Sequence, residues 1–95
     1  MLGLKYLVFF SKSGFDVDVL NEVIGGCGVV YQVARGRGFD VAVVLIERRD
    51  QMWCLERGLR GVEWVDGVML VDGVPRSITF ISPATFRPLV EVKFT

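Results

Sequence analysis

The sequence predicts a single α+β domain with the element order βαββαβ, followed by a short C-terminal strand extension. Three observations support this prediction. The chain has 95 residues, which is enough for one domain. Two segments with helical spacing of apolar residues alternate with strand-like segments, and 52% of all residues are hydrophobic. We expect the core domain to occupy residues 1–81, and we assign residues 82–95 to an extension of the same domain.

The first half of the chain predicts a strand, a helix and a hairpin. Residues 4–10 are rich in Leu, Val, Phe and Tyr and indicate a strand that is buried on both faces. Apolar side chains between positions 19 and 24 fall on one stripe of a helix. The segments 29–34 and 39–46 are dense in β-branched residues and are joined by a turn with two glycines at 35–38, which predicts a β-hairpin.

The second half predicts another helix and further strands. Asp50 can cap a helix that Gly61 ends. A period of two then runs through residues 62–70, and after an Asp-Gly turn the segment 74–81 returns as a strand. Alternation within 90–94 predicts a short terminal strand. The order strand, helix, strand, strand, helix, strand corresponds to the ferredoxin-like arrangement, also called the dimeric α/β plait.

The apolar content predicts self-association. The mean hydropathy is +0.46, and a chain this short buries only about 60–65% of its unfolded surface. In the predicted arrangement both helices cover one face of the sheet and leave the other face bare. Each Å² of bare apolar face costs about 25 cal/mol in water. We therefore expect a homodimer or a higher oligomer that is paired through the sheets.

Charge and hydropathy exclude several classes of partner. Eleven basic and eleven acidic residues give no net charge, which does not favour direct binding of nucleic acid. The longest apolar run, residues 41–46, is far too short to cross a membrane. The N-terminal segment has the pattern of a strand and not of a signal peptide, so we expect a cytoplasmic protein. Cys27 and Cys54 are then expected to be buried free thiols, with a disulfide as the alternative.

The residue types give little support to catalysis. The chain has no histidine, so neither a Ser-His nor a Cys-His pair can form. Its carboxylates lack the spacing of metal ligands, and Asp16 and Asp18 fit the acidic first turn of a helix. We expect no catalytic residue, no metal and no cofactor, and hence no enzyme.

The turn Arg35-Gly36-Arg37-Gly38-Phe39-Asp40 is the strongest candidate site. Glycines allow positive φ angles and leave backbone N–H groups accessible. An arginine adds bidentate binding of a carboxylate. The turn could hold the carboxylate of an amino acid or another small acid. It could equally be a plain hairpin loop with solvated arginines.

A longer stretch of the chain resembles a known family. Residues 19–23 and 29–40, ending in Val33-Ala34-Arg35-Gly36-Arg37-Gly38-Phe39-Asp40, are similar to the effector (RAM) domain of the Lrp/AsnC regulators. In that family a helix precedes a V-T-G-x-Y-D motif and an apolar strand. Leu59-Arg60-Gly61-Val62 is similar to the L-P-G-V turn of the family. The resemblance covers about residues 4 to 81 and includes no helix-turn-helix domain.

The resemblance implies a stand-alone module of transcription regulation that senses amino acids, forms oligomers and does not bind DNA itself. It implies dimers paired through their sheets, an amino-acid effector bound between dimers, and a full-length Lrp/AsnC-type regulator as a further partner. The ligand-binding residues predicted from the turn and from the resemblance are Arg35, Gly36, Gly38, Asp40, Asp66, Gly67 and Val68.

Two other functions fit the same pattern. The first is a purely structural assembly subunit that binds no ligand. The second is a small Cas2-like nuclease, whose opening strand the segment from Tyr6 to Phe10 resembles. Ser11 stands where such proteins place a catalytic aspartate, which counts against the nuclease.

Overall fold

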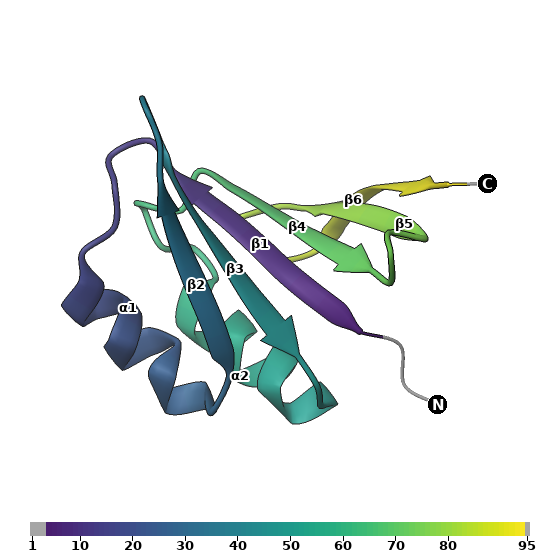
Figure 1. Cartoon of the computed structure of the whole chain (residues 1–95), viewed down its shortest axis with the longest axis horizontal. Helices are drawn as coiled ribbons and strands as arrows, with labels where there is room; N and C mark the ends of the chain where they lie inside the picture. Colours follow the sequence, from purple (N-terminus) through teal and green to yellow (C-terminus); the bar gives the residue numbers. More distant parts are fainter. Residues whose placement is uncertain (1–3, 95) are drawn as a thin grey trace.

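The computed structural model describes residues 4–94 and contains one six-stranded sheet with two short α-helices (Figure 1). A single 3₁₀ turn follows the first helix. In chain order the elements are β1 (Lys5–Ser11), α1 (Val17–Val23), η1 (Gly25–Cys27), β2 (Val30–Arg35), β3 (Asp40–Ile46), α2 (Arg49–Leu59), β4 (Gly67–Asp72), β5 (Ser77–Ile81) and β6 (Pro88–Lys93).

The strands lie in the order β2-β3-β1-β4-β5-β6, and every neighbouring pair is antiparallel. The predicted ferredoxin-like βαββαβ fold is therefore wrong, because the described chain is mostly β and has six strands in one sheet. The predicted extension 82–95 contributes β6, which joins the sheet next to β5, so that β5 and β6 extend the sheet beyond β4. The tight turn after Asp72 reverses the chain, and alternating side chains let each following strand pair with the one before it.

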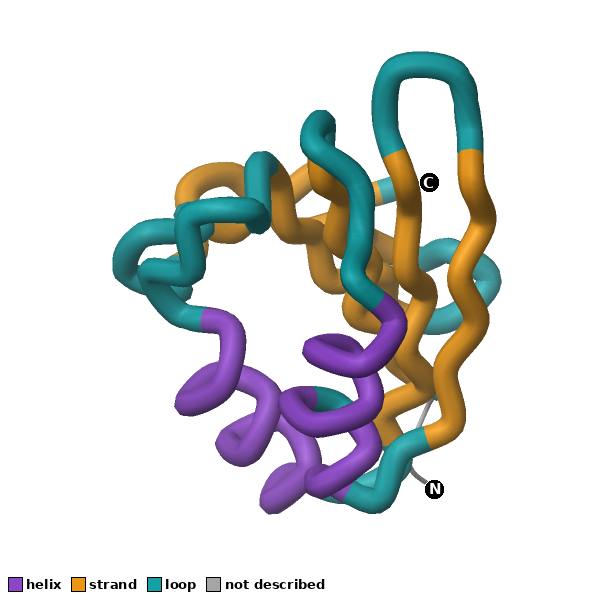
Figure 2. Tube along the Cα trace, turned by 90° about the vertical axis from the view of Figure 1, so that its left-hand side faces the viewer, coloured by secondary structure: helices purple, strands orange, loops and turns teal. Residues whose placement is uncertain are grey.

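Both helices lie on the same side of the sheet (Figure 1), and Figure 2 shows them together, apart from the strands. The fully buried core between helices and sheet includes Leu7 and Phe9 of β1 and Leu55 and Leu59 of α2. Within the part of the chain that the structure describes, no helix is long and apolar enough to cross a membrane.

The two helices approach each other closely at Gly58. A Cβ atom at Gly58 would lie 2.7 Å from Cγ1 of Val23 on α1, closer than side chains normally pack. A glycine inside a helix costs about 1 kcal/mol relative to alanine. Here its missing side chain makes room for α1.

A disulfide and a buried glutamine fix α2 to the segment after α1. Cys27 and Cys54 form a disulfide, so the prediction of two free thiols is wrong. Gln51 is only 1% exposed. Its Oε1 accepts hydrogen bonds from the backbone N–H groups of Glu47 and Arg48, and its Nε2 donates to the carbonyl of Gly28 at 3.1 Å. These links hold the N-terminus of α2 in place beneath the sheet.

Candidate functional site

The face of the sheet that points away from α1 and α2, here named the open face, is apolar across all six strands. Successive side chains of a strand point to opposite faces. Because Leu7 and Phe9 point toward the helices, their neighbours on β1 belong to the open face. Strand pairing aligns two cross-strand rows on this face, which are Val30, Leu45, Tyr6, Val71, Ile78, Val92 and Gln32, Val43, Val8, Met69, Phe80, Val90.

The side chains of the open face are partly in water. Val43, Phe80, Val90, Val92 and Val30 are between 39% and 65% exposed. The other apolar side chains of the two rows are half-buried, and they are Tyr6, Val8, Leu45, Met69, Val71 and Ile78. Neither row contains a charged side chain, and glutamine and tyrosine supply the only polar atoms. A contiguous apolar surface of this kind on a small domain marks an interaction site.

The C-terminal hairpin enlarges the open face and does not cover it. On β5, Ile78 and Phe80 point to the open face, while Ser77 and Thr79 point to the other side. On β6, Val90 and Val92 likewise lie on the open face, and Glu91 and Lys93 lie opposite Thr79 and Ser77. Apart from Ile81, which is buried in the core, the last two strands therefore have a polar side toward the helices and an apolar side that is continuous with the rest of the open face.

The predicted ligand-binding residues gather at one end of the sheet. Asp40 at the start of β3 pairs with Ser11 at the end of β1. On the other side of β1, Gly67 at the start of β4 pairs with Phe10. The turn 36–39 and the segment that contains Asp66 therefore lie at the same end of the sheet and flank the end of β1.

Asp40 connects the β2–β3 turn to the loop that precedes α1. Its carboxylate is largely buried, and Oδ2 accepts a hydrogen bond from the backbone N–H of Phe15 at 3.0 Å. Arg35 Nη1 lies 3.7 Å from the same oxygen, and Arg35 Nη2 donates to the carbonyl of Phe15 at 3.4 Å. Gly38 adopts a φ of 90°, as a turn glycine can, and Gly36 N–H closes the turn onto the carbonyl of Phe39.

The predicted site residues at the start of β4, which are Asp66, Gly67 and Val68, also make contacts within the chain. Asp66 Oδ2 accepts a hydrogen bond from the backbone N–H of Lys12 at 2.6 Å. Gly67 lies against the ring of Phe10, because a Cβ at this position would be 1.9 Å from Cε1 of that ring. Val68 is buried in the core and does not line a surface site. The structure thus brings the predicted residues together, but their contacts are those of a structural junction.

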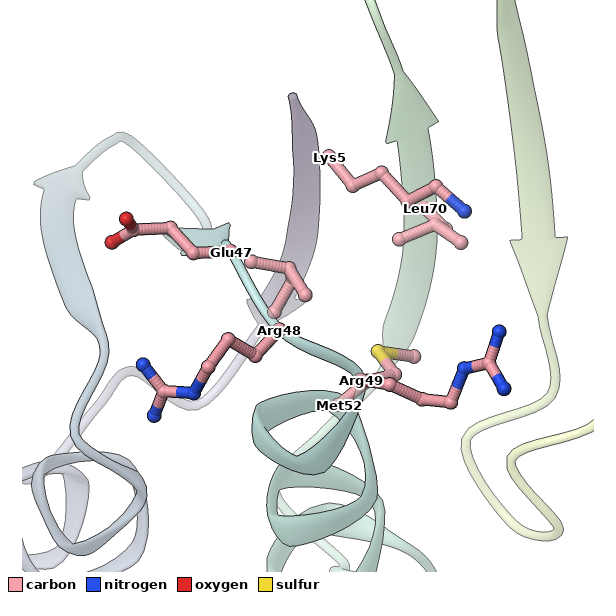
Figure 3. Close-up of a pocket in the computed structure, with 7 residues that line it drawn as sticks. Lys5, Glu47, Arg48, Arg49, Met52 and Leu70 are labelled. Atoms are coloured by element: carbon pink, nitrogen blue, oxygen red, sulfur yellow. The ribbon is translucent and has the colours of Figure 1, made fainter. Parts of the chain in front are cut away.

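A pocket of about 220 Å³ lies at the opposite end of the sheet (Figure 3). Its apolar wall is formed by Ile46, Met52 and Leu70. Figure 3 shows Lys5 and Arg49 on one side of the pocket and Glu47 and Arg48 on the other. Sequence reasoning missed this pocket, whose clearest sequence feature is the pair Arg48 and Arg49 at the start of α2. Its charges are mixed and divided between two sides, so the pocket does not define one class of ligand.

The described residues provide no metal site, and Asp16 has a structural role. Among residues 4–94 there is no group of three or more His, Cys, Asp or Glu side chains that could hold a metal ion. Asp16 Oδ1 accepts hydrogen bonds from the backbone N–H groups of Asp18 and Val19 and so caps α1. Asp16 therefore acts in the described chain as a helix cap.

Comparison of the chain with models of known protein families, with curated proteins and with solved structures finds no match in any of the three. The resemblance to the Lrp/AsnC effector domain accordingly stays a prediction. The open face is the feature on which a functional proposal can be built.

Proposed function

We propose that this chain is a self-assembling module that pairs its open face with the open face of a second copy. The observation that carries the proposal is the uncharged apolar surface across six strands, which the described residues leave in contact with water. Burial of this surface removes apolar area from water, and that is the main driving force of protein association.

The size of the open face suits a dimer. Six strands spaced about 4.8 Å apart place the outer strands about 24 Å from each other. Side chains on one face recur about every 6.8 Å along a strand, so the two rows together with a shorter third row, Ala34, Val41, Phe10 and Gly67, extend for about 20 Å in that direction. The face therefore measures about 500 Å² per copy and about 1,000 Å² for a pair, which is the lower bound for specific interfaces.

A second copy is favoured over other partners by the charge of the face. Nucleic acids and charged proteins are bound through complementary charges, and neither row of the open face has any. The chain as a whole has no net charge, so two copies do not repel each other. Two sheets can pack face to face at a separation of about 10 Å with their side chains interdigitated.

A charge placed on the open face tests the proposal. Val43→Glu introduces a carboxylate on β3 within the second row, where it would be buried without a partner in the assembly. Val74→Glu makes the same substitution in the turn between β4 and β5, where the side chain is 94% exposed. We expect Val43→Glu to at least halve the mass measured by light scattering and Val74→Glu to leave it unchanged. Equal masses for Val43→Glu and the unmodified chain would refute pairing through this face.

The sensing of an amino acid is a second proposal, and one observation favours it. The turn around Gly38 and the segment around Asp66 flank the end of β1, and the guanidinium of Arg35 is largely exposed there. A carboxylate could bind that guanidinium, and a full-length Lrp/AsnC-type regulator would then be a further partner. Against this stands the use of Asp40 and Asp66 as acceptors for backbone N–H groups, which favours a structural subunit without ligand.

Calorimetry of the folded oligomer with each of the twenty amino acids tests the sensing proposal. A heat of binding that is measured for the unmodified chain and lost in the Arg35→Ala variant would support the proposal. No heat of binding with any amino acid would refute it. Nothing in the arrangement of Asp16 or the other carboxylates favours the nuclease alternative, so we continue to propose a protein without enzymatic activity.

A cytoplasmic location belongs to the same proposal and has a specific consequence. Disulfides are rare in the cytosol except in hyperthermophilic organisms, and the structure joins Cys27 to Cys54. Alkylation of rapidly quenched cells, followed by mass spectrometry of the chain, measures the state of both cysteines. A disulfide in a cell whose cytosol is reducing would contradict the cytoplasmic assignment.

A further inference from the structure

We propose that two copies also join edge to edge through β6, in an antiparallel register centred on Val92. β6 is the last strand of the sheet, and all six of its residues are exposed. Its outer edge has backbone donors and acceptors with no partner strand, which is a template for pairing with another chain. The occupant we infer is the β6 strand of a second copy.

The pairing with β5 shows which backbone groups point outward. The N–H of Phe94 donates to the carbonyl of Arg76 at 2.9 Å, so Phe94 directs its N–H toward the β5 side. Backbone groups alternate in direction along a strand. The N–H and C=O groups of Glu91 and Lys93 therefore point away from β5, toward the free edge. The irregularity of the ladder lies next to Ile81 and outside this segment.

The side chains select one register. Pairing centred on Val92 places Glu91 opposite the partner's Lys93, and Lys93 opposite the partner's Glu91. Each of these two pairs exchanges two backbone hydrogen bonds and adds a cross-strand pair of opposite charges. A register centred on Glu91 would place two carboxylates opposite each other, which is unfavourable.

The same register continues the open face. On that side of the sheet Val92 meets its own symmetry copy, and Val90 meets the partner's Phe94. Both are non-hydrogen-bonded positions, where side chains of neighbouring strands come closest. The open faces of two copies then form one apolar surface of twelve strands. If two such surfaces pack as proposed above, the assembly contains four copies; this number rests on the proposed function, whereas the edge contact does not.

Three variants of β6 test the edge contact. Glu91→Pro removes an outward N–H and blocks the edge, while the ladder to β5 keeps its hydrogen bonds. Glu91→Lys places like charges opposite each other, and the double variant Glu91→Lys/Lys93→Glu restores opposite charges with their positions exchanged. Glu22→Lys, on an exposed position of α1, is the matched control for the change in net charge.

Light scattering and native mass spectrometry give the expected outcomes. We expect four copies for the unmodified chain, the control and the double variant, and two copies for Glu91→Pro and Glu91→Lys. A Glu91→Pro variant with four copies would overturn the edge contact, and a double variant that remains at two copies would overturn the register. If the unmodified chain has two copies and Val43→Glu is a monomer, the edge contact is refuted and the pairing of open faces stands. A monomeric unmodified chain would refute both.

Discussion

Reduction of the disulfide is expected to lower the stability of the fold by a calculable amount. Cys27 and Cys54 are 27 residues apart in sequence. Closure of a loop of this length in the unfolded chain removes an entropy that corresponds to about 3.6 kcal/mol at 25 °C. A chain of 95 residues unfolds with an entropy of about 0.2 kcal/mol/K near its midpoint, so the loss translates into a decrease in Tm of about 18 °C.

Thermal unfolding followed by circular dichroism, at fixed protein concentration, measures this decrease with and without a phosphine reductant. The double variant Cys27→Ala/Cys54→Ala is expected to unfold near the temperature of the reduced chain, and the reductant should not change its Tm. A decrease below about 5 °C on full reduction would refute the reasoning, because it would mean that the loop is already restricted in the unfolded state.

Three further substitutions test individual contacts by chemical denaturation. Gly67→Ala would place a Cβ 1.9 Å from the Phe10 ring, and we expect a loss of about 1–3 kcal/mol; an unchanged midpoint would contradict this packing. Gln51→Leu leaves two backbone N–H groups and one carbonyl without their partner, which should cost about 3 kcal/mol or more; stability equal to that of the unmodified chain would show that water replaces the amide. Asp40→Ala removes the acceptor for the Phe15 N–H and should cost about 1–3 kcal/mol; a variant of unchanged stability would argue against the structural role of this carboxylate.

The local pattern of the sequence predicted the early elements well. The strand expected at 4–10 is β1, and the hairpin expected from 29–34 and 39–46 is β2 and β3. These segments have a strong period, and glycines mark the turn between them. The alternation of apolar residues predicted that the fourth strand begins near residue 62. Residues 62–66 form no strand, and β4 begins at Gly67.

What the sequence could not predict depends on contacts between distant segments. The fold class was wrong because the alternation within residues 90–94 predicts that a strand forms but not which strand it pairs with. The disulfide requires η1 and α2 to meet in space. Gly36 and Gly38 were correctly predicted in the turn between β2 and β3, whereas Gly67 was expected inside a strand and is the first residue of β4. The partners of its carboxylates, the N–H groups of Lys12 and Phe15, lie 25 or more residues away in sequence.

The proposed function requires that a second copy covers the open face and excludes water from it. Sedimentation equilibrium of the unmodified chain, from low to high micromolar concentration, measures this most directly. The proposal predicts a mass of two or more copies of the 10.6 kDa chain throughout the upper part of that range, and a smaller mass for Val43→Glu. A single-copy mass at the highest concentration, for a chain that is fully folded by circular dichroism, would contradict it.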